Sequence, residues 1–403
     1  MASKTKSFSD ELADEYIGFA VDLNRFMDGH AVREVIAELR SLEVILVEQI
    51  EAADLAGYAI ESYKVRRLQA LLQQTKETIK ASYKKVSKLH KTTLNQLSKI
   101  QAEAAVGMAN TIADFELMTV AFTGTDYKNI VTGSLIEGHP AEAWWAKQGD
   151  NLKHAFEGQL RQGLLQAETN QELVQRIRGR ATGRRIPITT SKGSTIVVNE
   201  YAGGIMDVPR HQAESLVRTS VQSVSNRTLF ETYKENQDVL KGFELLVTLD
   251  GRTSEICMAR SGGAWDFQGD PLPQSAVDMR FPGEPPYHFR CRSILLPITF
   301  SFDEIISTKR FDGLGDTRPN LKASMDGTVS GIKTFEQWLK TKDVEFQKEK
   351  LGPGKWQLWS KGKITLAQLV DGRGNPLTLQ QLEAIAGKKK YRRNQPVMNP
   401  PAK

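Results

Sequence analysis

The chain has 403 residues, of which 40% are hydrophobic and 25% charged, and a formal net charge of +6. This length predicts two to three domains at roughly 150 residues each, and an ordinary content of Gly and Pro excludes a collagen-like or wholly disordered chain. Two cysteines exclude a disulfide scaffold, no apolar run approaches the ~20 residues of a membrane helix, and the polar N-terminus does not resemble a signal peptide. We therefore expect an intracellularly made protein that has no contact with a membrane.

Residues 31–115 are predicted to form long helices. The stretch contains no Pro, and its only Gly residues are Gly57 and Gly107. Apolar residues recur at steps of three, four and seven, which predicts one apolar stripe. The stripe consists of Leu68, Leu72, Ile79, Tyr83, Val86, Leu94, Leu97, Ile100 and Ala104. Such a stripe requires a partner surface, in this chain or in another.

A row of lysines follows one face of the same predicted helix. The row consists of Lys76, Lys80, Lys84, Lys88 and Lys91, spaced by four, four, four and three residues. We interpret this lysine row as an interaction face for an acidic protein surface or for nucleic acid, while an ordinary solvated helix face is the plainer alternative. The acidic surface includes the chain's own first 60 residues, whose charge balance is −7.

The middle of the chain mixes helices with one hairpin. Thr169 and Glu172 have the spacing of a capping box, and the alternating Ile, Thr and Val residues around Ser191 favour a β-hairpin. The predicted elements are a loop at 116–140, a helix from Ala141, a short helix ending near Gly179, a hairpin at Ile186–Val198 and a helix at His211–Lys234.

Beyond Lys241 we predict two short strands separated by a stretch that is too rich in Gly and Pro to be helical. The strands are Phe243–Leu249 and the segment SILLPITF. Near the C-terminus, TFEQWLKTKDVEFQKEKLG is predicted to form one helix ending at Gly352, and a capped helix is predicted from Thr378. The basic tail after Gly387 is predicted to be disordered.

Both cysteines lie in the segment between the two strands. Cys257, His288 and Cys291 are three potential zinc ligands, with Asp250 or Glu255 as a fourth. The positions that would complete Cys pairs are Ser254 and Ser293, which are poor ligands. We therefore favour a metal-free minidomain held by buried Cys and His side chains and expect no cofactor, with zinc as the alternative. A Cys257–Cys291 disulfide is disfavoured in a reducing compartment.

The charged residues of this segment are expected to lock its fold. Asp250 follows a strand and precedes a Gly, so its carboxylate can accept backbone N–H groups in a turn. Arg252 and Arg292 can clamp that carboxylate, and His288 can fix the Pro-rich loop through either ring nitrogen.

The segment resembles the Mu F-type phage head morphogenesis family, also called minor head or minor capsid proteins. The resemblance rests on a helix motif, an LD-x-R-T-x-x-x-C motif and a P-x-H-x-x-C-R motif, in that order. The residues that match are Arg218, Thr219 and Asn226, then Leu249, Asp250, Arg252, Thr253 and Cys257 with Gly262 or Gly263, then Pro286, His288, Cys291 and Arg292. The resemblance to this family is strong over residues 205–300. Many members carry further cysteines where this chain has Ser254 and Ser293, and this departure weakens the case for a metal.

Together these patterns predict an α+β protein. It would have a mainly helical N-terminal region with long helices, a small α/β minor-head module with a Gly/Pro-rich loop, and a small C-terminal region. The predicted boundaries are 1–120 for the long helices, 121–204 for a connector with a hairpin, 205–300 for the Mu F-like module, 301–387 for a C-terminal domain and 388–403 for a basic disordered tail.

The resemblance implies a virion protein made in the host cytoplasm and located in the head or portal region. Its implied partners are the portal protein, the major capsid or scaffold protein, and packaged DNA, with which it would be packaged or ejected. No nucleophile elbow, H-E-x-x-H or P-loop occurs, so we do not expect an enzyme. The alternatives are a DNA-binding internal virion protein and a metal-dependent hydrolase.

Overall fold

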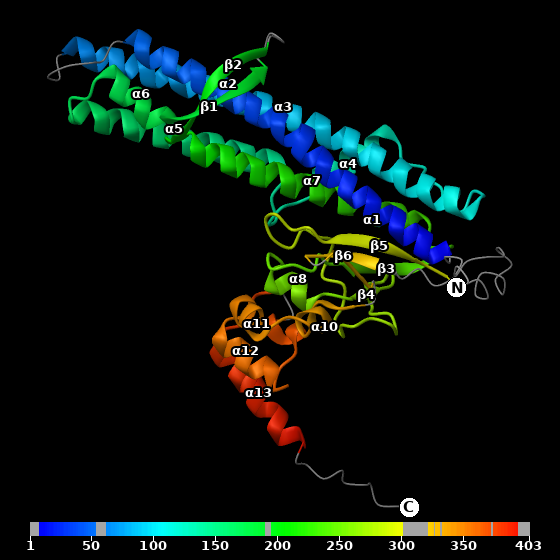
Figure 1. Cartoon of the computed structure of the whole chain (residues 1–403). Helices are drawn as coiled ribbons and strands as arrows, with labels where there is room; N and C mark the ends of the chain where they lie inside the picture. The colour runs from blue at the N-terminus through cyan, green and yellow to red at the C-terminus, as the bar shows by residue number, and fades with distance from the viewer. Residues whose placement is uncertain are drawn as a thin grey trace, which may run out of the picture.

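The computed structural model describes residues 8–53, 62–189, 195–300, 321–325, 327–330, 333–371 and 374–393. A long helical body packs on a small antiparallel sheet, and a C-terminal group of helices covers the far side of the sheet (Figure 1). The predicted α+β class is confirmed. Within these residues, no helix has the length and apolar character needed to cross a bilayer.

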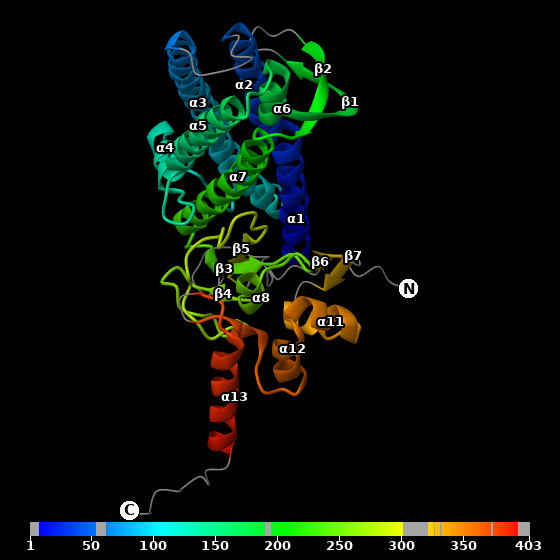
Figure 2. The same ribbon diagram turned by 90° about the vertical axis from the view of Figure 1, so that its left-hand side faces the viewer.

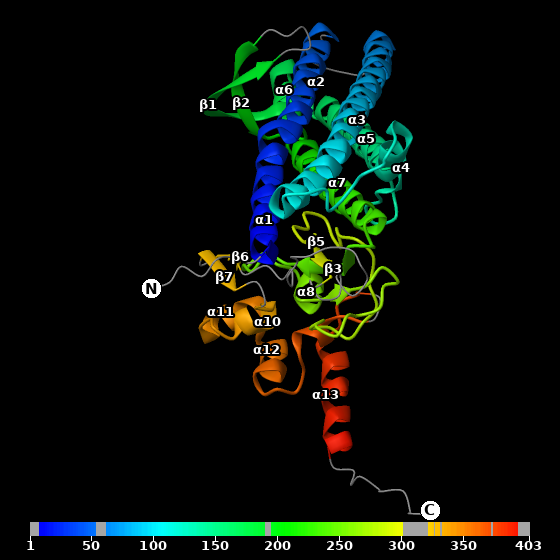
Figure 3. The same ribbon diagram turned by 90° about the vertical axis from the view of Figure 1, so that its right-hand side faces the viewer.

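The helical body is built from eight helices of the described chain, which pack lengthwise (Figures 1 and 3). They are α1 (Phe8–Phe26), a π-helical turn (Met27–Ala31), α2 (Val32–Ala53), α3 (Ser62–Ala113), α4 (Gly124–Gly133), α5 (Ala141–Leu165), α6 (Asn170–Arg178) and α7 (Asp207–Glu235). The predicted apolar stripe of α3 faces the body's core, apart from the exposed Ile100 and the half-buried Ala104.

Local capping chemistry explains several helix starts. The predicted capping box of Thr169 and Glu172 is present at the start of α6, and Gly179 follows its last residue. A second capping box, Thr123 with Asp126, starts α4 inside the segment that we predicted to be a loop, so that prediction is wrong for residues 124–133. The helix α1 lies within the predicted long-helix region of residues 1–120, although the sequence analysis delimited helices only from residue 31.

The predicted hairpin is confirmed and is longer than expected. Strand β1 (Gly179–Thr189) pairs antiparallel with β2 (Thr195–Gly203), and residues 190–194 lie outside the described chain. The hairpin starts directly at the end of α6, because Gly179 adopts a left-handed conformation with φ of 85°. It projects beside α2 and α6 at one side of the helical body (Figure 2).

The sheet has the order β4-β3-β5, with β3 (Leu240–Leu246) in the middle. Strand β5 (Ile294–Thr299) runs antiparallel along β3, and β4 (Ala264–Trp265) adds a short edge. The segment between β3 and β5 was predicted to lack helix, but it contains the single-turn helix α8 (Glu255–Ala259), which precedes β4. Ser254 caps α8 by accepting a hydrogen bond from the Cys257 backbone N–H, so a local cap overrides the Gly/Pro-rich composition.

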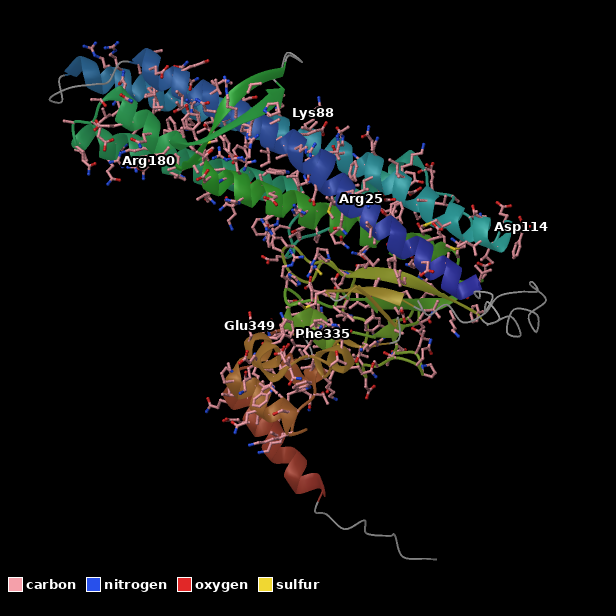
Figure 4. All side chains as sticks on the ribbon, viewed as in Figure 1. Arg25, Lys88, Asp114, Arg180, Phe335 and Glu349 are labelled. Atoms are coloured by element: carbon pink, nitrogen blue, oxygen red, sulfur yellow. The ribbon has the colours of Figure 1, made fainter. Side chains whose placement is uncertain are left out.

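The C-terminal region has its own small core around Phe335 and Trp338, which packs on Leu249 and Met258 of the module. Phe335 is labelled in Figure 4. The described elements are a short hairpin of β6 (Leu321–Ser324) and β7 (Gly327–Ser330), then α10 (Phe335–Leu339), α11 (Val344–Leu351), α12 (Pro353–Ser360), a 3-10 turn (Leu366–Leu369) and α13 (Leu379–Arg393).

Two predictions for this region need correction. The single helix predicted to end at Gly352 is in fact two helices, α10 and α11. The Asp343 carboxylate accepts a hydrogen bond from the Phe346 N–H and so begins a new helix at Val344. The second correction concerns the tail: helix α13 continues to Arg393, so the predicted disordered tail is wrong for residues 388–393. Residues 394–403 lie outside the described chain.

The capped helix start predicted at Thr378 is confirmed by its reciprocal hydrogen bonds with Gln381.

Candidate functional site

The buried helix α7 holds the segment His288–Leu295 by polar side chains. Asn226 is fully buried; its Nδ2 donates to the Ser293 carbonyl (3.1 Å) and its Oδ1 accepts from the Leu295 N–H (3.0 Å). Gln222 Nε2 donates to the same Ser293 carbonyl at 2.9 Å. These contacts hold the residue before β5 and the first residues of the strand, and we call them the α7 clamp.

Thr219 extends the α7 clamp by one turn. Its hydroxyl accepts a hydrogen bond from the Arg290 N–H at 2.9 Å and donates to the Ser215 carbonyl at 2.7 Å. Arg290 has a φ of 61°, a left-handed conformation that is uncommon for a side chain of this size. The clamp therefore fixes a tight bend directly before Cys291.

Arg218, the first residue of the predicted helix motif, does not contact the loop that the α7 clamp holds. Its guanidinium forms ion pairs with Asp28 of the π-helical turn and with Glu214 one turn earlier on α7. The structure thus brings Thr219 and Asn226 to the loop and places Arg218 in the contact with the N-terminal helices.

Cys257, His288 and Cys291 come together as the sequence suggested, and we call them the Cys–His cluster. The Cys257 sulfur lies 3.4 Å from His288 Nε2 and 3.7 Å from the Cys291 sulfur. Both cysteines are buried, and both are free thiols. His288 Nδ1 lies 2.8 Å from the carbonyl of Phe289, which fixes the orientation of the ring.

The neighbouring groups of the Cys–His cluster shift one another's pKa values in different directions. A hydrogen bond from Cys257 holds the pKa of the Cys291 thiol well below its usual range against the effect of burial, and His288 acts in the same direction. The pKa of Cys257 is raised, first by this hydrogen bond and then by burial. The pKa of His288 is raised by its hydrogen bond to Cys291, despite partial burial. Within the cluster, the Cys257 thiol therefore acts as the hydrogen-bond donor and the Cys291 sulfur as its acceptor.

The donor set fits three of the four ligands of a tetrahedral zinc site. Zn–S bonds of about 2.3 Å and Zn–N bonds of about 2.0 Å place ligand atoms about 3.5 to 3.8 Å apart, close to the two distances above. Among the residues that the structure describes, the group of side chains that could hold a metal ion consists of Cys257, His288 and Cys291. The predicted fourth ligands are engaged otherwise: Arg292 holds Asp250, and Lys355 Nζ lies 2.7 Å from both carboxylate oxygens of Glu255.

Asp250 organises the turn before α8, as predicted. Its carboxylate makes two hydrogen bonds with the Arg292 guanidinium, at 2.6 and 2.7 Å, and accepts from the Arg252 N–H at 2.8 Å. Thr253 donates to the Thr248 carbonyl at 2.5 Å and closes the same turn. Burial raises the pKa of Asp250, but the hydrogen bonds from Arg292 and the Arg252 backbone outweigh it and lower this pKa from 3.8 to about 2.

The predicted pairing of the Arg252 side chain with Asp250 is present but peripheral. Its side chain is 83% exposed and its ion pair with Asp250 is 3.6 Å long, so it contributes mainly through its backbone N–H. Arg292, at 31% exposed, is the actual partner.

Two residues of the site were missed because their signal is not local. Gln222 and Ser293 look like ordinary polar positions, yet Gln222 donates to the Ser293 carbonyl. The Ser293 hydroxyl also lies 3.4 Å from the Cys257 sulfur, where it donates a hydrogen bond. The spacing of Thr219, Gln222 and Asn226 by three and four residues puts all three on one face of α7, which is the pattern that could have revealed the clamp.

The structure places the lysine row on the exposed side of α3, away from the Cys–His cluster. Lys91 pairs with Glu142 of α5 at 2.6 Å. The N-terminal acidic helices reach α3 through a different lysine, since Glu38 pairs with Lys85 at 2.6 Å.

The fold and site define a structural module: a buried helix clamped to a small sheet through a polar loop. Residues 154–296, about a third of the chain, match the family model described as Phage Mu protein F like protein. The predicted Mu F-type resemblance is thus confirmed over α6, the hairpin, α7 and the clamped loop, and the family indicates a phage head morphogenesis protein associated with the virion. No curated protein and no solved structure matched the chain.

Asn226→Ala is expected to loosen the α7 clamp. The Leu295 N–H would lose its partner in a buried site, which costs about 1–3 kcal/mol of unfolding free energy. Hydrogen exchange followed by mass spectrometry should show faster exchange in peptides covering 288–296. Asn24→Ala, which removes an exposed hydrogen bond within α1, is the matched control and should leave these peptides unchanged. Equal exchange in both variants would contradict the clamp.

Arg292→Ala should destabilise the protein by about 2 kcal/mol at neutral pH, because it leaves the Asp250 carboxylate without its charged partner. Arg252→Ala should change stability by less than about 0.5 kcal/mol. Because the folded-state pKa of Asp250 is lowered to about 2, its stabilisation is present above pH 4 and is lost as pH falls toward 2. The gap between wild type and Arg292→Ala, measured by chemical denaturation, should therefore narrow over that range; a constant gap would argue against the pair.

The Cys–His cluster is expected to hold its loop without a resident metal, since structural zinc sites use four protein ligands. Purified protein should contain far less than one zinc per chain, and a chelator should leave its melting temperature unchanged. His288→Ala should speed hydrogen exchange around α8 and the 286–293 loop. About one zinc per chain, with a melting temperature that falls on chelation, would show that the cluster is a metal site.

Proposed function

We propose that the protein is a minor head protein of a bacteriophage that binds the portal, the inner capsid, or both, during head assembly. The observation that carries the proposal is the match of residues 154–296 to the Mu F-like family, because this stretch contains both halves of the α7 clamp. The long helical body supports it further, since it extends well beyond the module on one side of the sheet (Figure 1).

The site supports a structural role over a catalytic one. A nucleophilic cysteine has to reach its substrate, but Cys257 and Cys291 are each 3% exposed and contact each other. The Asp250 carboxylate is likewise bound by Arg292. We therefore propose that the protein is not an enzyme and that these residues lock the loop, in preference to a metal-dependent hydrolase.

The proposal can be tested in infected cells. A tagged copy should recover the portal protein or the major capsid protein, and purified heads should contain the chain, as measured by quantitative mass spectrometry. Asn226→Ala should reduce incorporation into heads at least severalfold, whereas Asn24→Ala should be incorporated normally. Absence of the chain from purified heads, together with recovery of neither portal nor capsid protein, would overturn the proposal.

A further inference from the structure

An open cleft lies between the β1–β2 hairpin and the helices beside it (Figure 2). Its volume is about 720 Å³. Residues of the hairpin line one side, and residues of α2 and of the first turns of α7 line the other. We call this space the hairpin cleft.

The direction of the β2 backbone follows from one proline of β1. Because the hairpin is a two-stranded sheet, each strand has an outer edge. Pro187 has no N–H to give to the ladder, so its nitrogen faces away from β2, and its partner Val197 in turn faces away from β1. Successive residues of a strand alternate, so Asn199 and Tyr201 face the same way as Val197.

Helix α7 occupies only the base of this outer edge of β2. There Arg210 donates a hydrogen bond to the Tyr201 carbonyl at 3.3 Å, and the Asp207 carboxylate accepts one from the Gly203 N–H. Arg210 and Asp207 both line the hairpin cleft, so the outer edge of β2 faces it. Within the described chain, we find no hydrogen bond to the outward backbone groups of residues 197 and 199. The edge of β2 is therefore open beyond the contacts of α7.

The two outer edges of the hairpin differ in their protection against strand addition. The edge of β1 carries Pro187 and an irregularity of the ladder between Ala181 and Arg185, two features that block a further strand. The described backbone of β2 has neither, and its Val197 side chain is 56% exposed. An open strand edge beside a cleft is the arrangement to which an extended peptide adds.

The opposite wall of the cleft is one face of α2. Ile36, Arg40 and Val44 recur every four residues and line the cleft together. All three side chains are only half-buried, so they are available to a partner. Arg40 makes no hydrogen bond or ion pair that we find among the described residues, and burial and the neighbouring Arg210 lower its pKa. This wall therefore offers two apolar contacts on either side of a guanidinium.

We propose that the hairpin cleft binds an extended segment of another head protein, which adds to β2 as a third strand. The backbone of the segment pairs with the open edge, its apolar side chains contact Ile36 and Val44, and one carboxylate meets Arg40. Residues 195–199 of β2 span about 17 Å, which sets a segment of about five residues. The inference rests on the proposed function only in taking the partner from the head.

The cleft selects a peptide over a nucleic acid in two ways. Nucleic acid is held by an excess of cations, whereas the charges that line this cleft cancel. They are Arg40, Arg178, Arg185 and Arg210 against Glu43, Glu200, Asp207 and Glu214. The open edge also presents N–H and C=O groups together, a pattern that a second β-strand completes and a phosphate chain does not.

The probe for the cleft is a labelled nine-residue peptide that alternates Val with Thr and has one central Asp. Its fluorescence anisotropy with the full-length chain should show saturable binding. A second peptide has the same side chains but carries N-methyl groups on the amides of both edges, so it cannot pair as a strand. It should bind at least tenfold more weakly. Equal binding of the two peptides would overturn the proposal.

Asn199→Pro tests the open edge on the protein itself. It removes an outward N–H but no hydrogen bond to β1, because residue 199 faces away from that strand. Binding of the peptide should weaken at least tenfold. Thr189→Pro makes the same change on the outer edge of β1 and is the matched control, with binding expected within twofold of wild type. Circular dichroism melting checks that both variants keep the helical body, and normal binding by Asn199→Pro would contradict strand addition.

Arg40→Gln tests the charge of the cleft. It should weaken the Asp-containing peptide at least threefold and leave a peptide with Asn in place of Asp within twofold. Two other occupants give different results. Displacement of the peptide by a 20-bp duplex would assign the cleft to DNA, and a dimer of the chain that Asn199→Pro converts to monomer, measured by light scattering, would assign the edge to a second copy. Either result would overturn the proposal.

A photo-crosslinker at position 197 tests the cleft inside infected cells. It should crosslink a segment of another head protein that has alternating apolar residues and a carboxylate, and Asn199→Pro should remove that crosslink. Heads that contain the chain but yield no such crosslink would refute the strand addition and leave the proposed function intact. Absence of the chain from heads would refute the proposed function, while the peptide measurements would still decide on the cleft.

Discussion

The buried carboxamide of Asn226 connects the two halves of this protein. On one side it belongs to α7, the central helix of the body, and on the other it holds the Ser293 carbonyl and the Leu295 N–H at the start of β5. Everything beyond this junction depends on the position of that loop: Cys291 meets Cys257 of α8, and Arg292 meets Asp250 in the turn before α8. The C-terminal core is tied to the same elements through Leu249 and Met258.

The loop needs this help because it has little regular pairing of its own. Between β4 and β5 the chain runs for almost thirty residues without strand or helix, so its backbone polar groups are satisfied by scattered turn hydrogen bonds and by side chains. The sequence places two polarised pairs, Cys291 with His288 and Arg292 with Asp250, on one short segment. Removing one partner of the Arg292–Asp250 pair leaves a partly buried charge, so the segment is expected to be sensitive to substitution there.

Local patterns in the sequence predicted what depends on local chemistry. The helix starts at Thr169 and Thr378 follow from capping spacing, and the strands around β3 and β5 follow from apolar composition. The same chemistry was overlooked at Thr123 and Asp343, where flanking Gly or Lys residues masked the cap. The site was only half predictable: its titratable residues carry a motif, whereas Gln222 and Ser293 act through a contact 71 residues apart that no local pattern contains.

The clamped loop and the lysine row lie in different parts of the chain. The α7 clamp and the Cys–His cluster fall inside residues 154–296, so the family match describes how the module is held together. The lysine row lies on α3, outside the matched residues. Its exposed side chains make no contact with the α7 clamp, so substitutions in the row change the surface charge of the helical body and leave the contacts that hold the loop in place. The surface charge of the body and the packing of the module can therefore be altered one at a time, which separates the effects of the two features in any assay of the whole chain.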